Sequence, residues 1–457
     1  MTTSPARRAG EDGRPLAVAV LAAGKGTRLA LGDETPPKVL LECLGVPLLE
    51  HVRRAVTQLA PDTVVVVTGH DAERVEAWLA DSWPEALAVR QIPQEGTGQA
   101  LRLALDAIPT FEGDVIVAYG DVPQVRGADL ARLLETHRGA DAGATVLSGR
   151  ATDPGALGRI VRGVGGAFVE IVEARDAASR PEVLAVNEFN TGFYAFDADA
   201  LRPALVDLSR ANAQGEEYAT EAVNRIAASG RGVASVLAED PGALLGVNSF
   251  DDLAQAVSAV RRRIASEHMA RGVHIVDPDT TVIEVDVEIA AGARILPFTH
   301  VGRGCRIGKG ASVGPFARLR GGTVLEAGAE AGNFVEMKAT RMGEGAKAKH
   351  LTYLGDADVG ARANIGCGTV TANYDGKRKH KTTIEERASI GSGTILVAPV
   401  TVGAGARTGA NAVVPSGRDV PPGETVVGVP AKPLPGAGAR GEQSSSERDS
   451  REQEEQS

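Results

Sequence analysis

The stretch from Ile289 to Val313, IAAGARILPFTHVGRGCRIGKGASV, places an aliphatic residue at every sixth position. Glycine, alanine and polar residues fill most of the places between them. A period of six with glycine-rich corners is typical of a parallel β-helix of hexapeptide repeats, in which three short strands make one triangular coil. A glycine-rich loop region would not keep an aliphatic residue in phase over so many steps. We therefore expect a β-helix in this part of the chain.

The six-residue phase continues beyond this stretch and returns after a gap. The residues in phase are Ile289, Ile295, Val301, Ile307, Val313, Leu319, Leu325 and Ala331, and then Ile384, Ile390, Leu396, Val402, Thr408 and Val414. The phase is interrupted at about 338–351 and at about 373–383, and we interpret both interruptions as loops that leave the prism. Loops on a rigid scaffold are where binding and catalytic residues concentrate.

The chain before the β-helix has a different pattern, from Leu16 to about Asn248. Its apolar runs AVAVLAA, TVVVVTGH and DVIVAYGDVP alternate with the helix-like stretches LLEHVRRAVTQL and ERVEAWLADS. Strands that alternate with amphipathic helices favour βαβ units and a mainly parallel sheet covered on both faces. Ligands of such folds bind at the carboxyl ends of the strands.

Between the two parts, four apolar residues at helical spacing predict a connecting helix: Leu253, Val257, Val260 and Ile264. The stretch from Gly436 onward is polar, charged and without aliphatic residues, which favours disorder. The expected segments are a disordered N-terminal tail at 1–14, an α/β domain at 15–250, a linker helix at 251–272, a β-helix domain at 273–435 and a disordered C-terminal tail at 436–457.

Composition narrows the class of partner. The 457 residues carry a net charge of −10 and no basic block that would grip a nucleic acid, so we expect small phosphorylated ligands rather than polynucleotides. The three cysteines are widely spaced and odd in number, which fits neither a disulfide framework nor a metal cluster. We find neither a signal peptide nor a run of about 18 apolar residues, and expect a cytoplasmic protein without membrane insertion.

The segment LAAGKGTRLA at 21–30 follows an apolar run that predicts a buried strand. Backbone N–H groups of a glycine-rich turn at a strand end can cradle a phosphate. The spacing is neither a Walker A loop nor a dinucleotide GxGxxG, because Leu29 takes the place of the third glycine. A tight turn without a ligand would account for the glycines, but not for Arg28 and Lys38 near the same strand end.

Further motifs follow in an order that resembles the bifunctional N-acetylglucosamine-1-phosphate uridyltransferase/glucosamine-1-phosphate N-acetyltransferase family, from about Leu16 to Pro430. They are PPKVL (36–40), QIPQEGTGQA (91–100), AYGDVPQV (118–125), GRIVR (158–162), IVEARDA (171–177), EFNTGFYAF (188–196), NAQGEEYATEAV (212–223), GVNS (246–249), GPFARLR (314–320), GNFVEMK (332–338), KHLTYLGD (349–356), ANIGCGTVTANYDGKRKHKT (363–382) and IGSGTILVAPV (390–400).

The resemblance implies a Rossmann-like nucleotidyltransferase domain followed by a left-handed β-helix. It also implies two reactions that together make UDP-N-acetylglucosamine, a precursor of peptidoglycan and lipopolysaccharide. The C-terminal site would transfer acetyl from acetyl-CoA to glucosamine-1-phosphate. The N-terminal site would transfer uridylyl from UTP to the acetylated sugar phosphate and release pyrophosphate.

In the N-terminal site, where uridylyl is transferred, several negative charges converge, so positioning and charge neutralisation carry the catalysis. The resemblance assigns Arg28 and Lys38 to the triphosphate, and Asp121 and Asn248 to Mg²⁺ through oxygen ligands. The remaining contacts that it implies are Leu21, Ala22 and Gly24 in the phosphate loop, Gln91, Gly96 and Thr97 at the uracil, and Tyr119, Gly158, Glu173 and Asn190 at the acetylated sugar. The chain departs from the family at Leu157, where an aromatic residue is common, and at Glu221, where aspartate is usual.

The second site lies in the β-helix, where stacked coils make residues about 18 apart neighbours. Arg320 and Lys338 have that spacing and would form a cationic pair suited to a sugar phosphate, although a solvated ladder of charges is the alternative. His350 is a candidate general base, because an amine that attacks a thioester must lose a proton; a structural histidine is the alternative. The resemblance further implies Tyr353, Asn364 and Lys379 at the amino sugar, Asn373 and Tyr374 beside the reacting centre, and Cys367, Ser392 and Ala410 along the acetyl-CoA groove.

Acyltransferases of this β-helix class resemble trimers with sites at the prism interfaces, which implies a homotrimer. Two other hypotheses stay open. One is a nucleotidyltransferase for another sugar phosphate whose β-helix is only a trimerising or regulatory module; His350 with Asn373 and Lys338 argues against it. The other is a non-catalytic assembly subunit with decayed sites, which intact Arg28, Lys38, Asp121 and Asn248 disfavour.

Overall fold

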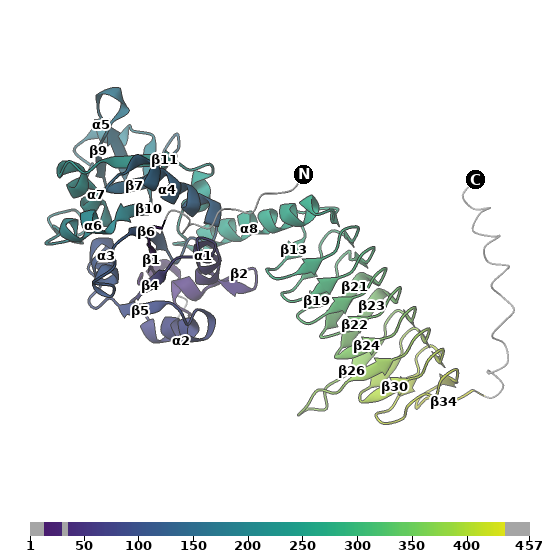
Figure 1. Cartoon of the computed structure of the whole chain (residues 1–457). Helices are drawn as coiled ribbons and strands as arrows, with labels where there is room; N and C mark the ends of the chain where they lie inside the picture. Colours follow the sequence, from purple (N-terminus) through teal and green to yellow (C-terminus); the bar gives the residue numbers. More distant parts are fainter. Residues whose placement is uncertain (1–12, 30–34, 435–457) are drawn as a thin grey trace, which may run out of the picture. The chain divides into compact units, whose positions relative to one another are not determined.

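The computed structural model describes residues 13–29 and 35–434 (Figure 1). The chain divides into two compact units, Met1–Val260 and Arg261–Ser457. The N-terminal tail expected at 1–14 lies outside the described residues except for Gly13 and Arg14. The C-terminal tail expected at 436–457 lies outside them entirely, and so does residue 435. Among the described helices, none is long and apolar enough to cross a membrane.

The first unit is a sheet with helices packed on it. Its strands are β1 (Leu16–Leu21), β4 (Thr63–Thr68), β5 (Leu87–Arg90), β6 (Asp114–Tyr119), β7 (Ala144–Arg150), β8 (Arg159–Arg162), β9 (Phe168–Val172), β10 (Glu188–Asp197) and β11 (Val233–Leu237), beside a small pair of β2 (Glu42–Cys43) and β3 (Val46–Pro47). Its helices are α1 (Leu48–Thr57), α2 (Ala72–Ser82), α3 (Thr97–Asp106), α4 (Gly127–Ala140), α5 (Pro181–Leu184), α6 (Ala198–Ala204) and α7 (Ala219–Ala228). Short 3₁₀ turns are η1 (Thr27–Leu29), η2 (Lys38–Leu40), η3 (Val164–Gly166) and η4 (Pro241–Leu244).

The strand order is β11-β7-β10-β6-β1-β4-β5, with β8 and β9 attached through β10. β1 is parallel to β4 and β6, and β4 is parallel to β5, which confirms the mainly parallel sheet. β10 runs antiparallel between β6 and β7. The sequence pattern did not indicate this reversal, because β10 carries the same apolar run as a parallel strand.

Alternating residues of the central strand face opposite layers. Ala17 and Ala19 belong to the core shared with α3, α6 and α7, whereas Val18 and Val20 belong to the core shared with α1, α2 and α4. Both faces of the sheet are therefore covered, as expected. The carboxyl ends of β1, β4 and β6 lie at one edge, since these strands are parallel and in register, and the loops that follow them meet there.

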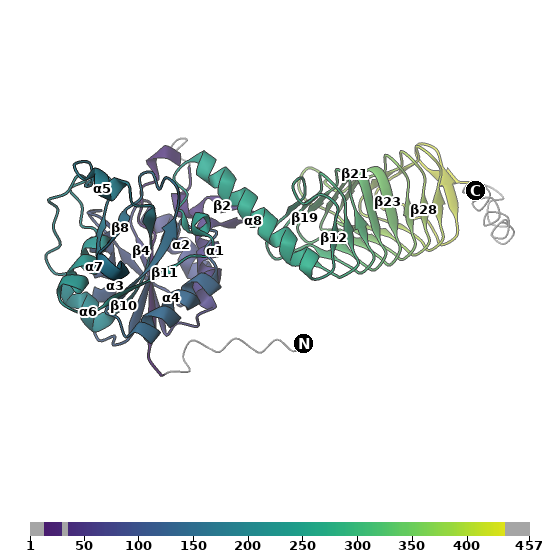
Figure 2. The same cartoon turned by 90° about the horizontal axis from the view of Figure 1, so that it is seen from above.

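The helix expected between the two parts is α8 (Phe250–Ala270). After it, the chain forms a left-handed parallel β-helix, seen along its length in Figure 1 and from above in Figure 2. Three ladders of short strands run along it, which we call faces 1, 2 and 3 in the order in which a coil visits them.

Face 1 consists of β12 (His274–Ile275), β15 (Arg294–Ile295), β18 (Ser312–Val313), the first parts of β21 (Glu330–Lys338) and β23 (Lys347–Gly355), β25 (Asn364–Ile365), β28 (Ser389–Ile390), β31 (Arg407–Thr408), β33 (Thr425–Val427) and β34 (Lys432–Pro433). Face 2 consists of β13 (Val282–Ile283), β16 (His300–Val301), β19 (Arg318–Arg320), the last parts of β21 and β23, β26 (Val370–Ala372), β29 (Ile395–Val397) and β32 (Val413–Val414). Face 3 consists of β14 (Glu288–Ile289), β17 (Arg306–Ile307), β20 (Val324–Leu325), β22 (Arg341–Met342), β24 (Ala357–Val359), β27 (Thr382–Ile384) and β30 (Val400–Val402).

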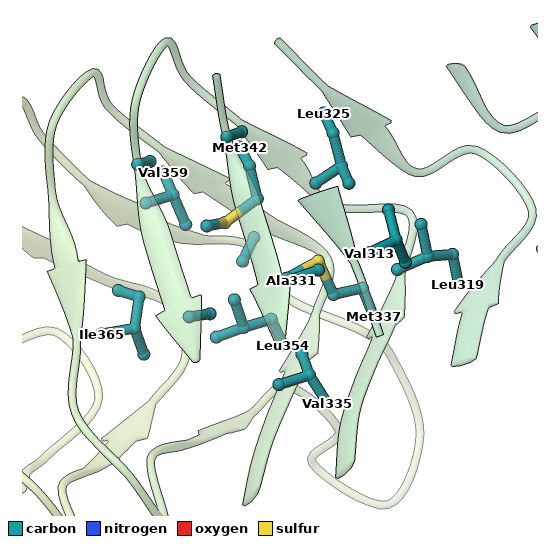
Figure 3. Packing of buried hydrophobic residues seen from close by; sticks show 14 of the residues in the cluster. Val313, Leu319, Leu325, Ala331, Val335, Met337, Met342, Leu354, Val359 and Ile365 are labelled. Atoms are coloured by element: carbon teal, nitrogen blue, oxygen red, sulfur yellow. The ribbon is translucent and has the colours of Figure 1, made fainter. Parts of the chain in front are cut away.

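The in-phase residues fill the interior of the prism. Val301, Leu319 and Leu325 are at most 1% exposed and belong to one continuous hydrophobic cluster. Figure 3 shows Leu319, Met337 and Leu354 packed in this interior. The six-residue period is thereby confirmed as the period of inward-pointing side chains.

One of the two expected interruptions is wrong. The segment 338–351 does not leave the prism: it contains β22, and Glu330 pairs with Lys347 in the next coil. That coil has 17 residues, whereas the preceding one, from Ser312 to Glu330, has 18. A single missing residue at the corner shifted the phase without removing a strand. The second interruption is a projecting loop, closed by a bridge between Tyr374 and Lys379, and β27 resumes the prism at Thr382.

Candidate active sites

Two adjoining cavities open at the carboxyl edge of the first unit's sheet. The first, of about 500 Å³, is lined by Leu21, Ala22 and Gly24 after β1, by Gln91, Gly96 and Thr97, and by Lys38. The second, of about 350 Å³, is lined by Tyr119, Gly158, Glu173 and Asn190. The linings of the two cavities share Thr97, Tyr119, Asp121 and Glu216, so the cavities adjoin at these four residues.

Lys38, Asp121 and Asn248 come together at this junction although they are far apart in the sequence. The Lys38 ammonium forms an ion pair with the Asp121 carboxylate and donates a hydrogen bond of 3.1 Å to Asn248 Oδ1. Lys38 lies in η2, Asp121 just after β6, and Asn248 just before α8. The Val247 N–H donates to the Asp121 carbonyl over 3.0 Å, which ties the last two segments together.

The oxygens of Asp121 and Asn248 fit a divalent cation. One carboxylate and one amide oxygen already converge on a positive charge, the Lys38 ammonium. Hard oxygen donors of this kind suit Mg²⁺, whose other ligands are usually water molecules and substrate phosphate oxygens. The described ranges contain no cluster of three or more His, Cys, Asp or Glu that could hold a metal ion.

The phosphate loop approaches Lys38 closely. Gly26 has a φ of +58°, and a Cβ atom there would lie 2.8 Å from Lys38 Cβ. A side chain at this position would displace Lys38, so the glycine is required by the left-handed backbone and by contact. Arg28, in η1, is exposed and does not line either cavity. The structure therefore brings Lys38 to the candidate site but not Arg28.

The Gln91 side chain is buried and held in place. Its amide nitrogen donates to the Gly96 carbonyl over 2.8 Å and to Gln99 Oε1 over 2.7 Å. Gly96 has a φ of +119°, and a Cβ atom there would lie 2.3 Å from the Glu217 carbonyl oxygen. This segment is thus fixed against the loop before α7, with Thr97 at the first residue of α3.

The second cavity is polar and desolvated. Burial raises the pKa of the Glu173 carboxyl above its ordinary value of 4.5, while the hydrogen bond of 3.1 Å from the Thr220 hydroxyl acts in the opposite direction. Asn190 donates from its amide to the Tyr194 hydroxyl over 2.6 Å. Burial also raises the pKa of the Tyr119 phenol well above its usual range. Sequence reasoning did not select Thr220, although it lies within the motif at 212–223 and its hydroxyl could have been noticed there.

In the β-helix, the candidate base His350 and three of the candidate acetyl-CoA residues share one corner, between faces 1 and 2. Ala348, Ile365 and Ile390 are register partners in successive coils, and the residues two positions after them are His350, Cys367 and Ser392. Ala410 continues the column in the next coil, because the Asn411 N–H donates to the Ser392 carbonyl. His350, Ser392 and Ala410 are exposed and Cys367 is half-buried. The structure therefore arranges these four candidates along one edge.

The candidate sugar-phosphate residues gather at the opposite edge of face 2. Arg320 and Lys338 are direct register partners, as the 18-residue spacing predicts. The Lys338 and Lys379 side chains lie in contact, and this contact is the main cause of a lowered pKa at Lys338. Tyr353 lies on the same face, one coil further along.

Asn364 lies elsewhere on the prism. It belongs to face 1, where its register partners are Lys347 and Ser389. Side chains that point outward from faces 1 and 2 diverge, so one chain does not bring Asn364 to Lys338 or Lys379. Asn373 is 7% exposed and ends face 2, and Tyr374 follows it in the projecting loop at 61% exposure.

Comparisons with known proteins support the two-part fold. The model of the MobA-like NTP transferase domain matches residues 18–218, and the model of the bacterial transferase hexapeptide (six repeats) matches residues 286–321. The bifunctional protein GlmU of Rubrobacter xylanophilus is 42% identical, covering 93% of this chain and 95% of that protein. The chain belongs to the GlmU family of bifunctional proteins.

Two other GlmU proteins are similar to this chain at comparable identity and coverage. That of Thermobifida fusca is 43% identical, covering 91% of this chain and 92% of its own length, and that of Mycobacterium bovis is 40% identical over 90% and 89%. As a GlmU protein, this chain is a bifunctional transferase of UDP-N-acetylglucosamine synthesis, with a nucleotidyltransferase part and an acetyltransferase part.

Proposed function

We propose that the junction of the two cavities is the uridylyltransfer site and that the edges of face 2 carry the acetyltransfer site. The observation that carries the first assignment is the convergence of Lys38, Asp121 and Asn248 where the cavities meet. UTP occupies the larger cavity and N-acetylglucosamine-1-phosphate the smaller one. The sugar phosphate then lies next to the α-phosphate that it attacks.

Uridylyl transfer at this junction is a displacement at phosphorus. A phosphate oxygen of the sugar phosphate bonds to the α-phosphorus of UTP, the bond from that phosphorus to the bridging oxygen breaks, and pyrophosphate leaves with the electron pair. Lys38 stabilises the charge that develops on the phosphate oxygens. Asp121 and Asn248 would hold Mg²⁺, which neutralises the phosphate charges when bound. Arg28 is exposed and lines neither cavity, so its contact with the triphosphate rests on the resemblance of its motif alone.

The polar groups of the smaller cavity recognise the sugar. Glu173 accepts hydrogen bonds from sugar hydroxyls, and its contact with Thr220 leaves the second carboxylate oxygen for this purpose. Gly158 keeps the cavity open, since a Cβ atom there would lie 3.2 Å from Glu173 Oε2. Leu157 supplies an apolar wall where the family commonly has an aromatic ring.

Acetyl transfer takes place on face 2 of the β-helix. Arg320, Lys338 and Lys379 bind the phosphate of glucosamine-1-phosphate, and acetyl-CoA lies along the corner column of His350 and Ser392. The amine nitrogen attacks the thioester carbon, the carbon–sulfur bond breaks, and CoA leaves as the thiol. His350 accepts the proton that the nitrogen loses and returns it to the sulfur.

A second copy of the chain completes this site. Asn364 lies on a different face from Lys338, so both reach one sugar only if they come from two chains. Closed rotational symmetry makes every such interface equivalent, and three copies around one axis supply three sites. We therefore propose a homotrimer. A cytoplasmic location is supported by the cysteine usage, because Cys43, Cys305 and Cys367 are few, widely spaced and odd in number, which does not suit a disulfide framework.

The test is a double dissociation of the two activities in one protein. His350→Ala is expected to abolish release of CoA from acetyl-CoA and glucosamine-1-phosphate while UDP-N-acetylglucosamine formation from UTP is unchanged. Lys38→Ala is expected to lower the second activity by about 10²- to 10³-fold and to spare the first. If both activities fell together in either variant, the two-site assignment would be wrong. If wild-type protein released no CoA but still consumed UTP, the β-helix would be a scaffold only.

A further inference from the structure

Five side chains of the β-helix surround Gly355 at the end of β23. A Cβ atom on Gly355 would lie 2.6 Å from Asn373 Nδ2 and 2.6 Å from the Tyr353 hydroxyl oxygen. Gly355 is also the register partner of Lys338, whose side chain contacts Lys379. The amide of Asn373 and the hydroxyl of Tyr353 therefore meet over a position that has no side chain, beside the two lysines.

Asp356 is the fifth side chain around this point, and neither sequence motif nor resemblance gave it a role. Its backbone is fixed on both sides: its N–H donates to the Lys338 carbonyl over 2.9 Å, and its carbonyl accepts from the Thr382 N–H over 3.2 Å. Its φ is +49°, a left-handed conformation that asparagine, aspartate and glycine adopt most readily. The position of the carboxylate is thus determined by the corner of the prism.

The Asp356 carboxylate accepts a hydrogen bond from the Asn373 amide nitrogen. A carboxylate only accepts, so this bond decides the orientation of the amide: the nitrogen faces Asp356 and the oxygen faces away from it. Asn373 Oδ1 receives no hydrogen bond from any residue in the described part of the chain, and it is not one of the buried atoms without a partner. This oxygen is therefore accessible on the surface of face 2.

We propose that Asp356 is a positioning residue for acetyl transfer: it fixes Asn373 so that the amide oxygen accepts a hydrogen bond from the amine of the acceptor sugar phosphate. The inference rests on the proposed function of face 2. With the phosphate on Lys338 and Lys379 and one N–H of the amine on Asn373, the nitrogen lone pair is aimed at the thioester carbon. Correct orientation of a reacting group contributes a large part of the rate, and a misplacement of about 1 Å costs about 10²-fold.

The experiment removes and then restores the acceptor at position 356. Asp356→Gly keeps the left-handed backbone and deletes the carboxylate, and we expect kcat of acetyl transfer to fall by about 10- to 100-fold with little change in the KM of glucosamine-1-phosphate. Asp356→Asn retains an acceptor oxygen, and we expect it to keep kcat within about 5-fold of wild type. Asp358→Ala is the matched control, because Asp358 pairs with Lys381 and Arg341 rather than with Asn373.

A double-mutant cycle separates positioning from a general structural effect. In an Asn373→Ala background, Asp356→Gly is expected to cost no further activity. An equal loss in that background would overturn the proposal, and so would an Asp356→Asn variant as slow as Asp356→Gly, because the negative charge and not the hydrogen bond would then matter. Wild-type protein that makes no N-acetylated product would instead refute the proposed function itself, whatever position 356 contains.

Discussion

Single residues in the two candidate sites owe their chemistry to burial rather than to their identity alone. Glu173 is an example, since its carboxyl is desolvated inside the smaller cavity and retains Thr220 as a hydrogen-bond donor. Desolvation disfavours the charged form, so the carboxylate becomes neutral at a higher pH than an exposed glutamate would. A neutral carboxyl is a poorer acceptor for sugar hydroxyls. Recognition of the sugar should therefore weaken on the acidic side earlier than an ordinary pKa of 4.5 implies.

This predicts a pH dependence of sugar binding that belongs to Glu173. As pH falls through the raised pKa, we expect the KM for N-acetylglucosamine-1-phosphate to rise in wild-type protein. The side chain of Glu173→Gln is neutral at every pH. This variant should have a higher KM than wild type at neutral pH, and its KM should lack the rise that protonation of Glu173 causes. The phosphate of the substrate titrates near pH 6 in both proteins, so the ratio of the two KM values isolates Glu173. A ratio that does not change between neutral and acidic pH would contradict the prediction.

At the scale of one coil, stability depends on the inward residues and function on the outward ones. Leu354 and Leu351 both lie in β23, but Leu354 is fully buried and Leu351 is 59% exposed. Figure 3 shows Leu354 packed among residues of neighbouring coils, including Met337. Because each coil contacts only its neighbours, a cavity at Leu354 weakens the contacts of its own coil with the next ones.

We therefore expect Leu354→Ala to lower the free energy of unfolding of the β-helix by about 2–5 kcal/mol. Leu351→Ala, the matched control, should change it by less than about 0.5 kcal/mol, because little of its side chain is removed from water. Urea unfolding followed by circular dichroism measures both variants. Equal effects of the two substitutions would mean that the prism interior is not packed as Figure 3 shows.

Some of the strands could be predicted from the sequence pattern and others could not. Six-residue spacing predicted the β-helix because inward residues of every coil must be apolar, and one missing residue between Lys338 and Arg341 was enough to make a regular coil resemble a loop. β10 was not identified as antiparallel, since both of its faces are buried and its apolar run carries no sign of direction. Asp356 was missed because its role follows from contacts with Asn373 and Lys338 that the chain makes only after folding.

For the whole molecule, the distribution of candidates over the prism determines how many chains form one site. Lys338 and Asn364 lie on different faces, so a site that uses both takes them from two copies. A chain with Lys338→Ala and a chain with Asn364→Ala should each transfer acetyl poorly. In a mixed trimer, however, some sites receive an intact Lys338 from one chain and an intact Asn364 from the other.

Co-expression of the two variants in equal amounts should therefore restore about one site of three in every trimer that contains both variants, because only one of its interfaces joins an intact Lys338 to an intact Asn364. The measurement is CoA release at a low concentration of glucosamine-1-phosphate by trimers that carry two different affinity tags, with each variant purified alone as the control. Lys338→Ala co-expressed with Lys338→Arg does not combine intact residues and controls for trimer stabilisation by mixing. If Lys338 and Asn364 acted within one chain, no mixed trimer would contain a complete site, and activity would stay at the level of the separate variants.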